Sequence, residues 1–141
     1  MSKWAPHIVG LATPLLAIIG LMLGGWWMLV PIILLLGIYP LLDTFAGSTT
    51  VHDVEQEGLG HDIIVHLHGL LVPLVVLALL FRIWDGIGTI SIAVPILSAG
   101  LATGAAGVVA AHELGHRKPK SFSWWLGRLD LFSVLYLHFT V

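Results

Sequence analysis

The feature that most constrains the fold is a long apolar segment, residues 8–42, which contains no charged side chain. As one helix it would be about 52 Å long at roughly 1.5 Å per residue, whereas the hydrocarbon core of a bilayer is about 30 Å thick. The segment therefore has to fold back on itself. A Gly-Gly-Trp-Trp run at 24–27 favours a tight turn at the headgroup level, because glycine permits the turn and indole rings prefer that level. We predict two membrane spans, at about 8–24 and 26–42.

The composition supports a membrane protein. Hydrophobic residues make up 57% of the chain and charged residues only 10%, which is far from the mixture of a soluble domain. Six Lys+Arg against eight Asp+Glu provide no concentrated basic face, so we expect membrane lipid around the protein and no nucleic-acid partner. The chain has no cysteine, so any metal must be held by His, Asp or Glu.

Two further apolar segments follow a polar connection at 43–62. We predict a third span at about 63–84 and a fourth at about 88–112. The fourth is crowded with small residues, and we expect Gly100 and Gly104 to let neighbouring backbones approach closely. The fourth span should therefore lie at the centre of the bundle.

The last segment, residues 121–141, is apolar but carries Arg128 and Asp130, which favours an interfacial helix over a fifth span. The predicted fold class is therefore all-α: a polytopic transmembrane helix bundle of four spans plus a C-terminal interfacial helix. The chain ends in Leu-His-Phe-Thr-Val without a polar tail or a helix stop signal. We accordingly expect it to be the N-terminal part of a longer protein.

Lysine and arginine set the expected orientation. They cluster after the fourth span, and an even number of spans puts the N-terminus on the same side. We therefore expect a multi-pass protein of the cell (inner) membrane, with its N-terminus and the end of the fourth span on the cytoplasmic side. The clustered residues are Arg117, Lys118, Lys120 and Arg128.

The end of the fourth span carries the sequence HELGH, with His112 and His116 one helical turn plus about 40° apart. Their imidazoles can converge on one ion, and neutral imidazole binds zinc, iron or copper. Ionisable residues at the end of a membrane span are functional by default, because they are costly there unless paired, hydrated or liganded. The alternative is that both histidines lie in the headgroup region beside Arg117 without binding metal.

Two chemistries use an H-E-x-x-H motif. In intramembrane zinc metalloproteases, zinc takes both histidines and a distant third ligand, and the glutamate, here Glu113, activates a water as general base. In diiron oxygenases, several histidine clusters surround two irons that activate O₂. The five letters of the motif fit both.

The wider context distinguishes them. GIYPLLD at 37–43 closes the second span, a polar loop and two spans follow, and then come AHELGHRK at 111–118 and LYLHFTV at 135–141. This order resembles the N-terminal part of the membrane-bound alkane 1-monooxygenases (alkane hydroxylases), relatives of the integral-membrane fatty acid desaturases and hydroxylases. The resemblance covers essentially the whole chain and is most specific at 112–118, where residues 112–117 match the first histidine box of that family, H-E-[LM]-x-H-[KR].

The resemblance implies a non-haem diiron monooxygenase that hydroxylates the terminal carbon of alkanes, using O₂ and electrons from a rubredoxin and its reductase. It implies two Fe ions as cofactor, with His112 and His116 as ligands. We expect Glu113 to hydrogen-bond a ligand histidine and fix its tautomer, and His138 to have a supporting or structural role near the metal. The other histidine boxes of the family are absent from this sequence, so further ligands must come from elsewhere and we expect the chain alone to be inactive.

Other histidines gather at the start of the third span, on the same side as HELGH. His61 and His68 share one helix face, and Asp62 and His66 share another. This group is either a polar lining near the site or a simple interfacial cluster. Two more histidines are expected to be solvated: His7 and His52.

Three alternatives remain open. A zinc protease needs an acidic third ligand, such as the aspartate of an N-x-x-P-x-x-x-x-D-G element, and the sequence has no such element. A related xylene monooxygenase or fatty acid desaturase would look the same over this part of the chain. A non-catalytic membrane scaffold would retain no metal.

Overall fold

The computed structural model describes residues 8–46, 58–88 and 91–136, and every structural statement below concerns these ranges. Helices and short turns account for all the described residues, which contain no strand, so the predicted all-α class is confirmed for them. The α-helices are α1 (Ile8–Leu23), α2 (Val30–Ile33), α3 (Tyr39–Ala46), α4 (Leu59–Asp85), α5 (Ala93–Gly115) and α6 (Phe122–Ser133).

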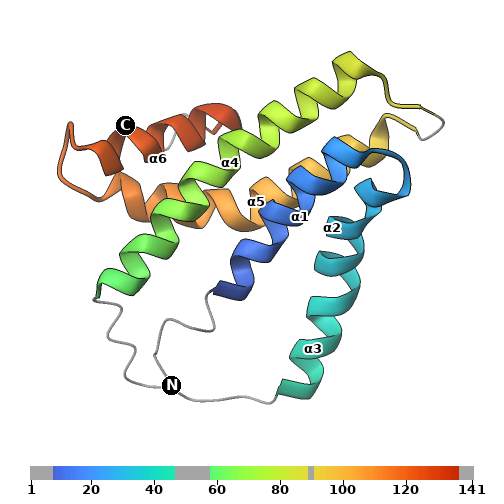
Figure 1. Cartoon of the computed structure of the whole chain (residues 1–141). Coiled ribbons are helices and arrows are strands. Elements are labelled where there is room, and N and C mark those ends of the chain that lie inside the picture. Colours follow the sequence, from blue (N-terminus) through green and yellow to red (C-terminus); the bar gives the residue numbers. More distant parts are fainter. Residues whose placement is uncertain (1–7, 47–57, 89–90, 137–141) are drawn as a thin grey trace.

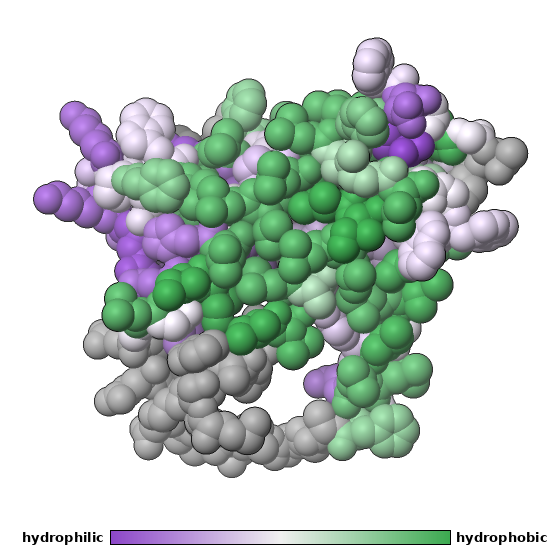
Figure 2. Space-filling view, viewed as in Figure 1, coloured by the Kyte–Doolittle hydropathy of each residue, from purple (hydrophilic) through white to green (hydrophobic). Residues whose placement is uncertain are grey.

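Three helical segments among the described residues are long and apolar enough to cross a membrane: Gly25–Phe45, Leu59–Asp85 and Ala93–Gly115. The first predicted span corresponds to α1, which has 16 residues and rises only about 24 Å. Large apolar side chains cover the outside of the bundle, and Figure 2 shows a broad hydrophobic face between hydrophilic groups at its left and upper right. These features indicate a membrane protein.

α5 lies at the centre of the bundle, as predicted, and packs against α1, α2, α4 and α6 (Figure 1). α4 and α5 run antiparallel, and α6 lies across both near the end of α5. The buried positions of α5 recur every three to four residues, the spacing of one helix face. They are Pro95, Ser98, Ala99, Ala102, Thr103, Ala106, Gly107, Ala110, Ala111 and Leu114.

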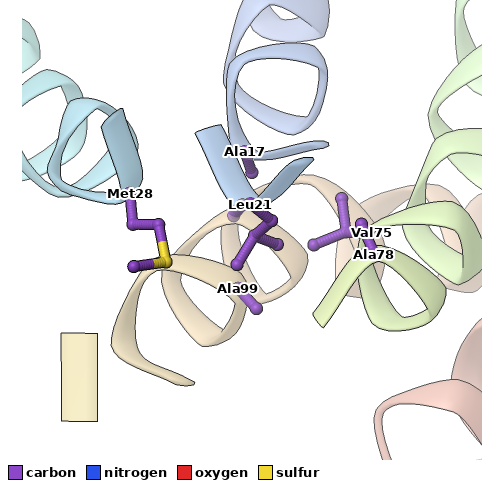
Figure 3. Packing of buried hydrophobic residues seen from close by; sticks show 7 residues of the cluster. Ala17, Leu21, Met28, Val75, Ala78 and Ala99 are labelled. Atoms are coloured by element: carbon purple, nitrogen blue, oxygen red, sulfur yellow. The ribbon is translucent and has the colours of Figure 1, made fainter. Parts of the chain in front are cut away.

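The main apolar core lies where α1 ends, α4 ends and α5 begins. In Figure 3, Leu21 of α1 lies at the centre, with Ala99 of α5 and Val75 of α4 close by and Met28 on the other side. Because this core contains the start of α5, the HELGH sequence at the end of α5 is at the opposite end of the bundle. The core therefore holds the helices together without occupying the candidate site.

The turn predicted between the first two spans is present. α1 ends just before Gly24 and Gly25, whose φ angles of 73° and 55° are in the left-handed region that favours glycine. Arg82 of α4 then donates from Nε to the Leu21 carbonyl at 2.7 Å and from Nη2 to the Met22 carbonyl at 2.8 Å. This guanidinium satisfies carbonyl groups that the end of a helix leaves without partners.

The second predicted span is not a uniform α-helix. It begins with a 3₁₀ turn, Gly25–Leu29, and contains a π-helical turn, Leu34–Ile38, between α2 and α3. Pro40 lies two residues after the π turn, and since proline lacks an N–H it cannot complete the regular hydrogen-bond pattern with the preceding turn. The helix then continues to Ala46, beyond the predicted end.

Two other predicted boundaries were wrong. α4 begins at Leu59 and not at residue 63, so His61 and Asp62 belong to the helix and not to the polar connection. The predicted interfacial helix is also shorter, because α6 ends at Ser133. Residues 137–141 lie outside the described part of the chain.

The prediction for Gly100 and Gly104 was wrong. No described atom lies within 4 Å of where a Cβ on either would be, because both are on the exposed face of α5. The close approaches occur at other glycines. A Cβ on Gly107 would lie 3.1 Å from Val72, and a Cβ on Gly127 of α6 would lie 3.0 Å from the Ala111 carbonyl oxygen.

Candidate metal centre

His112 lies in the last turn of α5 and His116 directly follows it as the C-cap residue, and their rings converge. Nε2 of His112 lies 3.1 Å from Nε2 of His116. The ring centroids are 4.6 Å apart and the ring planes are nearly perpendicular, at 85°. Both residues are exposed, so the ring nitrogens are accessible from outside the bundle.

This arrangement suits two neighbouring ligands of one metal ion. Imidazole nitrogens about 2.1 Å from a metal, at an angle between octahedral and tetrahedral values, are roughly 3.0–3.4 Å apart. The observed 3.1 Å is in this range. In the metal-free protein the same distance allows one ring N–H to donate to the other ring nitrogen.

Leu114, which lies between the two histidines in the sequence, anchors the last turn of α5. Leu114 is fully buried beneath α6 and α4. Its side chain would be 2.8 Å from a Cβ on Gly69 of α4 and 3.0 Å from a Cβ on Gly127 of α6, so both neighbouring helices need glycine at the contact. Burial of Leu114 therefore turns His112 and His116 outward.

A groove of about 690 Å³ lies beside the two histidines, between the end of α5 and α6. Trp124 and Arg128 of α6 form part of its wall, with the guanidinium carbon of Arg128 3.8 Å from the centre of the Trp124 ring. The groove is also lined by apolar side chains: Val108, Val109, Ala111 and Leu131.

Glu113 does not have the contact predicted for it. Its Oε1 accepts a hydrogen bond from Nη2 of Arg117 at 3.1 Å, and no bond to a histidine is recorded for it among the described residues. Arg117 lies four residues later, just beyond the end of α5, and this spacing makes it a favourable partner. The same nitrogen also donates to Oδ1 of Asp62 at 2.6 Å. The three charges thereby join the end of α5 to the start of α4, an ion-pair network that the sequence interpretation did not include.

The histidines of α4 separate into two groups. His66 contacts α6: its Nε2 lies 2.8 Å from Oγ of Ser123 and its ring stacks on Phe122, with centroids 6.3 Å apart. Its Nδ1 donates to the Asp62 carbonyl oxygen at 2.6 Å. His61 and His68 instead line a second cavity, described below. None of the three joins the pair on α5, and the described residues contain no group of three or more His, Asp or Glu side chains that could hold a metal.

The predictions for three other histidines fall on residues that the structure does not describe. These are His7, His52 and His138.

Asp130 of α6 is a buried ionisable residue that the sequence interpretation used only as a sign of an interfacial helix. It is fully buried, and neither carboxyl oxygen has a hydrogen-bond partner among the described residues. Its Oδ2 would be 3.1 Å from a Cβ on Gly69. Desolvation by burial raises the pKa of Asp130 to about 8.

The chain matches no protein-family model, no curated protein and no solved structure to which it was compared.

Proposed function

We propose that this chain is the histidine-box-bearing helix bundle of an integral-membrane non-haem diiron monooxygenase similar to the alkane 1-monooxygenases. In this proposal it has four membrane spans, with α6 at the membrane surface. The observation that carries the proposal is the pair of converging imidazoles at the end of a membrane-length helix, with Nε2 atoms 3.1 Å apart. The H-E-L-G-H-R sequence around them supports iron as the metal.

His112 and His116 would hold the iron through Nε2. When bound, iron supplies the activation of O₂ that hydroxylation of an unactivated C–H bond requires. The residues of the chain provide position: Leu114 anchors the turn that carries both rings, and the Arg117 contacts to Asp62 and Glu113 hold the end of α5 against α4. Two imidazoles do not complete a diiron site, so the proposal requires further ligands beyond the described residues.

The arrangement suits an apolar substrate and a soluble electron donor. An alkane dissolved in the bilayer can reach the bundle between its exposed apolar side chains. The exposed histidines lie beside Arg117, Lys118 and Lys120. By the bias of positive residues towards the cytoplasm, this end is the cytoplasmic one. A rubredoxin supplied with electrons by its reductase could then dock there.

The test is metal retention by the protein purified in detergent. We expect the wild-type protein to bind and hold Fe(II) in anaerobic equilibrium dialysis, which detects the weak binding that two imidazoles provide. His112→Ala and His116→Ala should each lose at least nine-tenths of it, because each removes one of two neighbouring ligands. His68→Ala is the matched control, since that ring lies on α4 away from the pair, and it should retain iron as the wild-type protein does.

Other results would contradict the proposal. Zinc bound stoichiometrically without iron would favour a zinc metalloprotease with Glu113 as general base. Retention of no metal by the wild-type protein would favour a non-catalytic scaffold. Equal iron in the wild-type protein and in both α5 variants would exclude His112 and His116 as ligands.

A further inference from the structure

A second cavity lies between the start of α1, the start of α4 and the second half of α5. Its volume is about 450 Å³, within the range of small-molecule sites. We infer that this α1–α4–α5 cavity binds an uncharged amphiphile with one hydrocarbon chain and a hydroxyl head. The inference depends on the size of the cavity, its charges and the tautomer of one histidine.

Small residues create the space for the hydrocarbon chain. Gly10 of α1 and the alanines at 105, 106 and 110 of α5 face the cavity, and Val109 and Ile64 add aliphatic surface. A polar ligand would leave most of this surface without favourable contacts, whereas a hydrocarbon chain gains free energy by burying it.

The charged side chains at the mouth of the cavity disfavour an anionic head. Asp62, Glu113 and Arg117 all line it, which gives two negative charges against one positive charge. The guanidinium of Arg117 already donates to both carboxylates. A carboxylate head could still reach other N–H groups of Arg117, since Nε is buried without a partner among the described residues, but it would meet the net negative charge of Asp62 and Glu113 over Arg117. A cationic head would have to compete with Arg117 for the same two carboxylates.

His68 provides the contact that favours a hydroxyl. Its Nδ1 lies 3.0 Å from the Ile64 carbonyl oxygen, and because a carbonyl can only accept, Nδ1 carries the proton. In the neutral ring Nε2 is then an acceptor. Nε2 has no hydrogen-bond partner among the described residues, and it points towards α1, where a Cβ on Gly10 would be 3.2 Å away. A hydroxyl group can donate to this nitrogen, whereas an alkane or a carboxylate cannot.

The cavity adjoins the candidate metal centre. Val109 and Glu113 line both the cavity and the groove beside the histidine pair. A primary alcohol released by terminal hydroxylation of an alkane has the chemistry inferred above, and identifying the natural ligand as this product rests on the proposed function. A neutral membrane lipid with a free hydroxyl, such as diacylglycerol, offers the same head chemistry from a different source.

The experiment measures binding of radiolabelled 1-dodecanol to the purified protein in nanodiscs, with unlabelled competitors. We expect saturable binding that 1-dodecanol displaces at least 10-fold better than dodecane, dodecanoate, dodecylamine or diacylglycerol. Ala105→Phe should weaken binding at least 10-fold by filling the cavity. Leu97→Phe is the matched control, because it adds a ring to the same helix at an exposed position outside the cavity, and it should bind as the wild-type protein does.

A second variant keeps the test informative if Ala105→Phe fails to fold. His68→Leu removes the acceptor nitrogen, so the advantage of dodecanol over dodecane should fall to less than 2-fold. Equal displacement by dodecane, dodecanoate or dodecylamine would overturn the inference, as would wild-type affinity in a folded Ala105→Phe protein. Stronger displacement by diacylglycerol would overturn the assignment to the alcohol product.

The same assay separates this inference from the proposed function. His112→Ala should bind dodecanol with unchanged affinity, because His112 does not line the cavity. Dodecanol binding by a protein that retains no iron would support the cavity and contradict the oxygenase. Iron retention without selective dodecanol binding would support the oxygenase and contradict the assignment of the cavity to an alcohol.

Discussion

Replacing Asp130 with asparagine should stabilise the protein much more at pH 8 than at pH 5. The carboxyl group is fully buried without a hydrogen-bond partner among the described residues, and desolvation raises its pKa from 3.8 to about 8. A raised pKa means that the folded state binds the proton more tightly than the unfolded state does. The contribution of Asp130 to stability is therefore most favourable below pH 4 and is lost as the pH rises towards 8.

The magnitude follows from the size of the shift. Each pKa unit corresponds to about 1.4 kcal/mol, and nearly three units of the shift are titrated between pH 5 and pH 8. The wild-type protein should thus lose on the order of 4 kcal/mol of stability over this interval through Asp130. Asparagine has nearly the same shape and stays neutral, so Asp130→Asn avoids this loss.

The assay is thermal unfolding in a mild detergent, followed by circular dichroism at pH 5, 6.5 and 8. The gain in Tm from Asp130→Asn should be about 10 °C larger at pH 8 than at pH 5, at roughly 3 °C per kcal/mol. Asp85→Asn is the control, since that carboxylate is exposed and ion-paired with Arg82, and it should give no gain at pH 8. The same Tm difference at pH 5 and pH 8 would refute the reasoning, because it would mean that Asp130 is hydrated or paired.

Four further substitutions test contacts between and within the helices. Gly127→Val should lower the free energy of unfolding by roughly 1–3 kcal/mol, because the Cβ of the new valine meets the backbone of α5. Gly104→Ala should be neutral or stabilising, because the space around Gly104 is open. Chemical unfolding of both variants measures these changes. Arg82→Ala should cost about 1–3 kcal/mol by leaving the last carbonyls of α1 without donors, which faster hydrogen exchange at the end of α1 would reveal. Arg117→Gln should lower the free energy of unfolding by less than about 1 kcal/mol, because the ion pair between Arg117 and Asp62 is partly exposed. A larger fall in the free energy of unfolding would contradict this prediction.

The helical class and the position of the first turn follow from local features of the sequence. Glycines at 24 and 25 and the length of the uncharged segment are sufficient to place that turn. The convergence of His112 and His116 is local too, because it depends only on a four-residue spacing in one helix.

Contacts between helices could not be derived in the same way. Gly100 and Gly104 have the spacing of a packing motif, yet Gly107 makes the contact, because the rotation of α5 is set by all of its neighbours together. The pairing of Arg117 with Asp62 joins residues 55 positions apart, and only the antiparallel arrangement of α4 and α5 brings them together. The contact between Glu113 and Arg117 is different, because it joins residues four apart and the spacing alone could have indicated it; the prediction tied Glu113 to the neighbouring histidines instead.

The shortness of α1 has a consequence for the surrounding lipid. In the proposed four-span arrangement, a rise of about 24 Å would leave this helix some 6 Å short of an average hydrocarbon layer. Its terminal carbonyls would normally have to reach water, but Arg82 supplies their donors from the neighbouring helix. In the four-span arrangement proposed above, these bonds would let the chain reverse direction without exposing the last carbonyls of α1 to lipid, and the bilayer would need to thin less around α1.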